Sequence, residues 1–135
     1  MSTQINIELE AEQHARLRHA AREMDQTPDA AAALVEEGLR LREFPGIHFR
    51  DTGIGRQAFV PGLRLPIYFL AELAREVAND IDAIMEYYGI SADAVTVSLA
   101  YARAHTAEID RAIADNLAAE DALVASLTPE RIVTV

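Results

Sequence analysis

The sequence predicts a mainly α-helical protein of two modules, each beginning with a short β-structure and continuing in helices. Three patterns support this prediction. Residues 3–9 alternate strictly between polar and apolar side chains, which is typical of a strand with one buried face. Most of the remaining chain repeats its apolar side chains every three or four residues, as amphipathic helices do. The run Phe44-Pro45-Gly46 interrupts the helical pattern and marks the boundary between the modules.

The first module, residues 1–45, is expected to contain one strand and two helices. Its strand places Ile5, Ile7 and Leu9 on one face, and a helix over 11–24 follows. Thr27 is a good N-cap for a second helix, because Pro28 then occupies the first helical position, where its missing N–H is not needed. That helix should end near residue 42. A single short strand has no hairpin partner nearby, so it must pair with a distant segment or with a second copy of the chain.

The second module, residues 46–126, is expected to contain a β-hairpin and four helices. The segments IHFR and RQAFV flank DTGIG, a glycine-bearing loop that favours a hairpin. The expected start and stop signals of the helices that follow are Pro66, Asn79 or Asp80 with Gly89, Ser91, and Thr106. The last helix should continue to residue 121 or beyond. The tail, 127–135, ends in the β-prone run RIVTV.

The composition favours a protein that is not an enzyme. The 135 residues include no cysteine, which excludes disulfides, thiolate metal sites and cysteine nucleophiles. Four histidines, six glycines and no tryptophan leave little material for a catalytic, metal or cofactor site, and we expect none of these. No apolar stretch is long enough to cross a membrane, and the N-terminus lacks a secretory leader, so we expect a cytoplasmic protein without a membrane partner.

The charge is strongly acidic but unevenly distributed. Twelve arginines, no lysine and 22 acidic side chains give a net charge of −10, so any DNA binding needs a local patch on an oligomer. Residues 46–66 are the exception, with three arginines (Arg50, Arg56 and Arg64) and one acid. These arginines could contact phosphate or could dock onto acidic groups of a partner. Alternatively, Arg50 could pair with Asp51 or with other acids of the chain itself.

The order strand, helix, capped turn, helix within about 43 residues resembles the ribbon-helix-helix fold of bacterial repressors. The resemblance implies a homodimer, or a higher even oligomer, whose N-terminal strands pair antiparallel and enter the DNA major groove. Ile5, Ile7, Leu9, Leu34 and Leu39 would then form the dimer interface. The outward Gln4, Asn6 and Glu8 would read bases of an operator, and the backbone N–H groups of Thr27 and Asp29 would hold a phosphate.

The second module is similar to a small helix-turn-helix domain found in VapB-type antitoxins, which are encoded beside PIN-like toxins. Three segments carry this resemblance: the hairpin run RDTGIGR, the turn YGIS at 88–91, and AYARAHTAEIDRAI at 100–113. The resemblance implies that the chain neutralises a PIN-like ribonuclease toxin and represses its own operon. Toxin contacts would come from Arg50, Arg56, Arg64, Ile109, Ile113 and Leu117.

Two questions about this module stay open at the level of sequence. The helix after Ser91 could enter a DNA groove, but its first turn carries only alanines and an acid, which favours a role in a core or a dimer module instead. The amphipathic segment 107–127 could bind a partner or pack on its own domain. The alternative functions are a ribbon-helix-helix transcriptional regulator without a toxin, and a structural helical adaptor.

Overall fold

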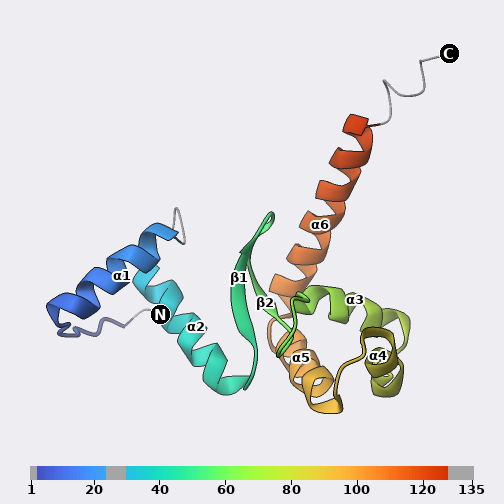
Figure 1. Ribbon diagram of the computed structural model, residues 1–135, viewed down its shortest axis with the longest axis horizontal. Helices are drawn as coiled ribbons and strands as arrows, with labels where there is room; N and C mark the ends of the chain where they lie inside the picture. The colour runs from blue at the N-terminus through green and yellow to red at the C-terminus, as the bar shows by residue number, and fades with distance from the viewer. Residues whose placement is uncertain (1–2, 24–29, 128–135) are drawn as a thin grey trace. The chain divides into compact units, whose positions relative to one another are not determined.

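The structure, a computed structural model, describes residues 3–23 and 30–127. This part of the chain is mainly helical, with six helices and one two-stranded antiparallel sheet (Figure 1). It divides into two compact units, residues 1–39 and 40–135. The division lies within the second helix, a few residues before the predicted boundary at Phe44-Pro45-Gly46, so the last turn of that helix belongs to the second unit.

The first unit contains α1 (Ala11–Glu23) and the first ten residues of α2 (Ala30–Glu43). Both helices match their predictions, whereas the strand expected over residues 3–9 is not formed in the single chain. A strand needs a backbone partner for its N–H and C=O groups, and no segment of the described chain pairs with this one. The predicted cap Thr27 and the phosphate-contacting Asp29 lie outside the described residues.

The second unit begins with the predicted hairpin, formed by β1 (His48–Thr52) and β2 (Gly55–Phe59). The strands pair antiparallel in a register that places Asp51 opposite Arg56 and Arg50 opposite Gln57. Thr52 closes the loop, because its hydroxyl donates to the Gly55 carbonyl at 2.7 Å.

Four helices follow the hairpin: α3 (Ile67–Glu76), α4 (Ile81–Tyr88), α5 (Ala92–Ala104) and α6 (Thr106–Leu127). The predicted signals at Asp80, Gly89 and Ser91 are confirmed. The Asp80 carboxylate accepts from the Ala83 N–H and the Ser91 hydroxyl accepts from the Ala94 N–H. Gly89 ends α4 in the left-handed conformation, with φ of 66°, which glycine adopts without strain.

One predicted cap is wrong. Thr106 was expected to cap α6, but its hydroxyl donates backwards to the Ala102 and Arg103 carbonyls at the end of α5. The His105 N–H also bonds to the end of α5, through the Tyr101 carbonyl, so a single residue separates the two helices. A hydroxyl placed after a helix end can satisfy its free carbonyls, and this need prevails over capping the next helix.

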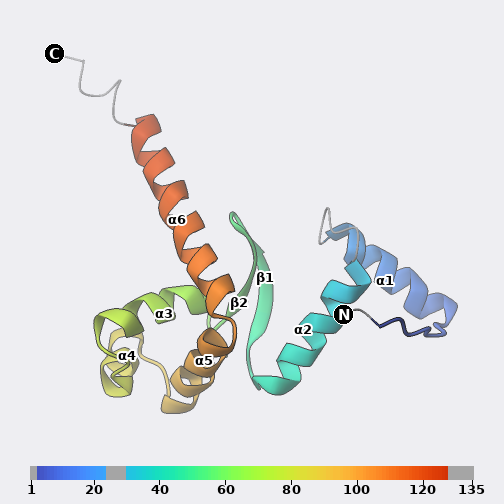
Figure 2. The same ribbon diagram turned by 180° about the vertical axis from the view of Figure 1, so that it is seen from behind.

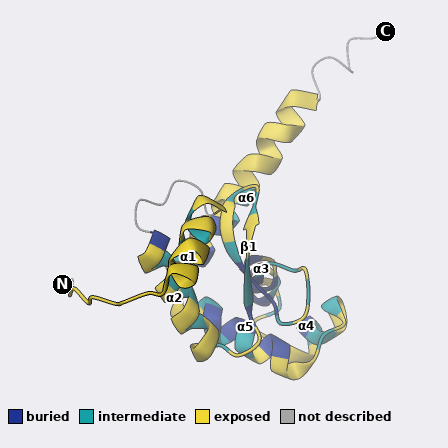
Figure 3. Cartoon of the chain, turned by 60° about the vertical axis from the view of Figure 1, so that its left-hand side comes forward, coloured by how far each residue is buried: buried dark blue, intermediate teal, exposed yellow. Residues whose placement is uncertain are grey.

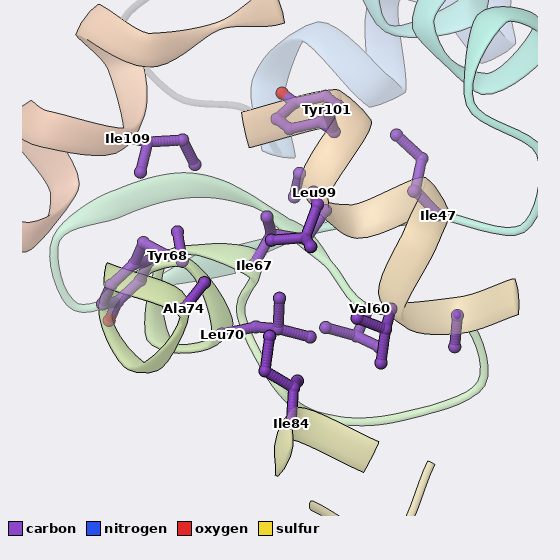
Figure 4. Close-up of a cluster of buried hydrophobic side chains, with 14 of the residues drawn as sticks. Ile47, Val60, Ile67, Tyr68, Leu70, Ala74, Ile84, Leu99, Tyr101 and Ile109 are labelled. Atoms are coloured by element: carbon purple, nitrogen blue, oxygen red, sulfur yellow. The ribbon is translucent and has the colours of Figure 1, made fainter. Parts of the chain in front are cut away.

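The core of the second unit lies where α3 packs against α4, α5, α6 and β2. Figure 4 shows its side chains converging from these elements, with Leu70 of α3 next to Ile84 of α4 and Val60 after the hairpin, and Ile67 of α3 next to Leu99 of α5. In Figures 1 and 2, α6 begins beside this core and then extends away from it. No helix in the described ranges combines the length and the apolar character that crossing a membrane requires.

Candidate interaction surfaces

The described part of the first unit contains an exposed apolar groove. We call it the N-terminal groove; it encloses about 450 Å³ and is lined by Ile5, Ile7, Leu9, Leu17, Ala31, Leu34 and Val35. Ile5 and Ile7 are 78% and 70% exposed, although isoleucine is among the residues most often buried. Adjacent exposed apolar side chains of this kind are typical of interaction surfaces.

The predicted dimer residues all belong to the first unit, and the structure brings most of them together. Ile5, Ile7, Leu9 and Leu34 line the N-terminal groove. Leu39, 52% exposed, is not part of its lining. The predicted base-reading side chains Gln4, Asn6 and Glu8 are exposed, as are all residues from 3 to 10.

The hairpin arginines do not form one basic cluster. Successive side chains of a strand point to opposite faces, so the register places Arg50 and Arg56 on opposite faces of the hairpin. Arg56 lies 3.4 Å from the carboxylate of Asp51, its cross-strand neighbour. The sequence alternative had assigned Asp51 to Arg50, which instead lies over the Phe59 ring at 5.8 Å. Arg64 is exposed in the turn before α3.

Helix α6 is buried only near its start, at Ile109 and Ala112, and its outer part is exposed, as the yellow colouring in Figure 3 shows. Ile109 is only 2% exposed and Ile113 packs against the core, so neither is available to a toxin as the sequence predicted. These two residues are needed to hold α6 on α3. Beyond them lies the distal face of α6, defined as Leu117, Leu123, Val124 and Leu127, whose members are 49–60% exposed.

A hydrogen-bonded network that sequence reasoning missed joins the last turn of α2 to α5 and α6. The Arg40 guanidinium donates to the Tyr101 hydroxyl at 2.6 Å and to Glu108 Oε1 at 2.8 Å. The Tyr101 hydroxyl in turn donates to Glu108 Oε2 at 2.7 Å. Phe44 and His105 pack against the Tyr101 ring, with ring centroids 5.2 and 4.7 Å away.

The central hydroxyl of the network is buried in a way that favours its protonated form. Tyr101 is fully buried, and this burial raises the pKa of its hydroxyl. The hydrogen bond to Glu108 and the negative charge of Glu108 raise the pKa further, whereas Arg40 lowers it. The helical spacing predicts that Phe69, Tyr87, Tyr88 and Tyr101 are core residues rather than a stacking platform. This is confirmed for Tyr101, which is buried, and is wrong for Tyr87, which is 70% exposed. The Tyr101 partner Arg40 is 61 positions away, and no local pattern could have identified it.

The described residues offer no group of three or more histidine, aspartate or glutamate side chains that could hold a metal ion. His105 contacts Tyr101, while Asp110 forms an ion pair with Arg75 of α3.

Comparisons with models of protein families, with curated proteins and with solved structures gave no match for this chain.

Proposed function

We propose that this protein is a homodimeric antitoxin of the VapB type, which silences a PIN-like ribonuclease and represses its own operon. The observation that carries the proposal is the N-terminal groove, together with the unpaired segment beside it. Residues 3–9 alternate in polarity as a strand does, yet have no strand partner in the described chain. A second copy supplies both the missing hydrogen bonds and the missing apolar cover.

Antiparallel pairing of residues 3–9 across a two-fold axis gives the ribbon of a ribbon-helix-helix dimer. In that arrangement Ile5, Ile7 and Leu9 of both chains cover the two grooves. The opposite face of the ribbon presents Gln4, Asn6 and Glu8 to the DNA major groove, which admits a two-stranded ribbon. Asparagine and glutamine suit adenine, and glutamate can accept from the amino group of cytosine. Backbone N–H groups at Thr27 and Asp29 would position the dimer on a phosphate.

The second unit offers two features for binding a toxin. The distal face of α6 presents an exposed apolar strip that fits a groove on a partner. Arg50 and Arg64 are exposed cations near the hairpin, and a PIN-like nuclease gathers carboxylates around its metal. An arginine inserted among those carboxylates would neutralise the centre and exclude substrate. Arg56 is less suited to this role, because Asp51 already faces it.

The dimer is tested by measuring the molar mass of two variants that gain the same charge on opposite faces of the segment. Light scattering coupled to gel filtration should give a dimer for the wild type and for Asn6→Asp, and a monomer for Ile7→Asp. An isolated carboxylate facing the apolar groove is strongly disfavoured, whereas the outer face is in water. A well-folded wild-type monomer, or an Ile7→Asp dimer, refutes the ribbon.

The toxin is tested by co-expressing the chain with the product of the adjacent gene, which should be a small nuclease. Leu123→Asp with Leu127→Asp should abolish the complex. Ala118→Asp with Ala122→Asp adds the same charge to the opposite side of α6 and should leave the complex intact. Equal behaviour of the two pairs, or no complex with the wild type, contradicts toxin binding by this face.

The operator is tested by retention of the chain's own promoter DNA, which should fall with increasing salt and with Gln4→Ala and Asn6→Ala. Retention that ignores both changes removes the ribbon from the contact. A dimer that retains DNA but forms no nuclease complex is the stand-alone regulator. A dimer that binds neither is the structural adaptor.

A further inference from the structure

A hollow between α3 and α4 combines aromatic rings with carboxylates. We call it the aromatic–acidic hollow; it encloses about 170 Å³ and is lined by Phe69, Glu72, Leu73, Glu76, Tyr87 and Tyr88. The first four residues come from one side of α3, at helical spacing. The two tyrosines form the last turn of α4, which stops at Gly89.

The aromatic part of the hollow is fixed in place but remains open to water. The Tyr88 hydroxyl donates to the Phe69 carbonyl at 3.3 Å, and the Tyr87 and Tyr88 rings meet edge to face at 4.9 Å. Tyr87 is nevertheless 70% exposed and Phe69 is 36% exposed. Large aromatic rings held in this way are typical of binding surfaces, because they offer contact area with little conformational freedom left to lose.

The two carboxylates of the hollow are placed where they repel each other. Glu72 and Glu76 are four residues apart on α3, and like charges at this spacing destabilise a helix. Neither has an ion-pair partner within the described residues. Desolvation raises the pKa of Tyr88, and so do the charges of Tyr87, Glu72 and Glu76, which agrees with the carboxylates lying close to its hydroxyl.

We propose that the aromatic–acidic hollow binds the guanidinium group of an arginine from a partner protein. A guanidinium stacks on the faces of aromatic rings and donates to carboxylates in the same plane, so one group can use both kinds of side chain in the hollow. It also removes the repulsion between Glu72 and Glu76. Residues 67–135 carry twelve acids against four arginines, a charge that favours a basic partner. The proposal needs neither the dimer nor the toxin.

The test is a titration of isotope-labelled, full-length protein with a blocked Gly-Arg-Gly peptide, followed by NMR. Citrulline in place of arginine is the matched ligand, because it keeps the shape and loses the charge. The arginine peptide should give saturable shifts at the residues of the hollow, and the citrulline peptide should give none. Equal shifts with both peptides, or no saturable shift with arginine, overturn the proposal.

Matched variants distinguish binding in the hollow from a general attraction to the negative charge of the chain. Glu72→Gln with Glu76→Gln should weaken arginine binding about fivefold or more, as expected for two exposed ion pairs. Asp82→Asn with Asp121→Asn removes the same charge elsewhere and should change binding by less than about twofold, because screened distant charges contribute little. Tyr87→Ala should also weaken binding, with helix content unchanged by circular dichroism. Equal losses in the two double variants overturn the proposal.

Discussion

Replacing Tyr101 by phenylalanine tests whether the buried network stabilises the second unit. The change removes one hydroxyl and keeps the ring that packs between Phe44 and His105. Two hydrogen bonds are lost, one from Arg40 at 2.6 Å and one to Glu108 at 2.7 Å. The direct contact between Arg40 and Glu108, at 2.8 Å, is retained.

The expected loss in the free energy of unfolding is about 2 kcal/mol at neutral pH. Hydrogen bonds to charged groups contribute about 1.5–3 kcal/mol each, which sets the upper limit for the pair. The side chains of Arg40 and Glu108 are 16% and 40% exposed, so water can replace the lost partner of Glu108 more easily than that of Arg40. The total loss in free energy is therefore closer to the contribution of one such hydrogen bond than to that of two.

Urea unfolding, followed by circular dichroism, measures this loss. If only stability has changed, the dependence of the unfolding free energy on urea concentration keeps the same slope. Tyr87→Phe is the matched control, because Tyr87 is 70% exposed and should change stability by no more than about 0.5 kcal/mol. If Tyr101→Phe costs no more than this control, the network does not stabilise the fold.

The same pair of proteins should differ in alkaline solution, because burial and Glu108 raise the pKa of Tyr101 in the folded state. Below the unfolded pKa of 10 its full contribution is present. Above that pH the unfolded chain loses the proton first, so wild-type stability falls with a slope of at most about 1.4 kcal/mol per pH unit. The variant lacks this dependence on pH, so the difference in unfolding free energy between the two proteins should narrow as the pH rises above 10. A constant gap across this range contradicts the argument.

Three further substitutions probe other features of the second unit by the same unfolding assay. Ser98→Ala should be neutral or stabilising by up to about 1 kcal/mol, because the Ser98 hydroxyl is buried without a hydrogen-bond partner in the described structure; a clear loss would reveal one. Gly89→Ala should cost about 1 kcal/mol through its φ of 66° alone, since a Cβ there meets no atom within 4 Å, and Gly89→Asn should cost less. Ile109→Ala should cost about 2–5 kcal/mol, whereas Leu123→Ala should stay within about 0.5 kcal/mol; similar losses at both would refute the division of α6 into a buried start and an exposed outer part.

The features that could be predicted from the sequence are those that depend on neighbouring residues. Asp80, Gly89 and Ser91 act within one helical turn of their own position, and each was identified as a helix start or stop. The hairpin followed from a glycine-bearing loop between two short apolar runs. In these cases the chemistry of one residue type and the geometry of one turn decide the local structure.

The features that were missed depend on residues far apart in the chain. Arg40 and Tyr101 meet because α2 ends beside α5, which no periodicity within either helix indicates. The register that places Asp51 opposite Arg56 depends on the length of the loop, and so the alternative that paired Asp51 with Arg50 named the wrong arginine. For Ile109, helical spacing indicated an apolar face but could not indicate that α3 covers it.

The two parts of α6 differ in what stabilises them, and this difference favours a partner for the distal face. Isolated helices of fewer than about 12–15 residues are marginal in water, because nucleation is unfavourable. The anchored part, which contains Ile109 and Ala112, supplies the nucleus, and the residues beyond it add one hydrogen bond each. In this outer part of the helix, Leu117, Leu123 and Leu127 are exposed to water. A partner that covers these side chains therefore gains apolar burial on a helix that is already formed, without the cost of ordering a disordered segment.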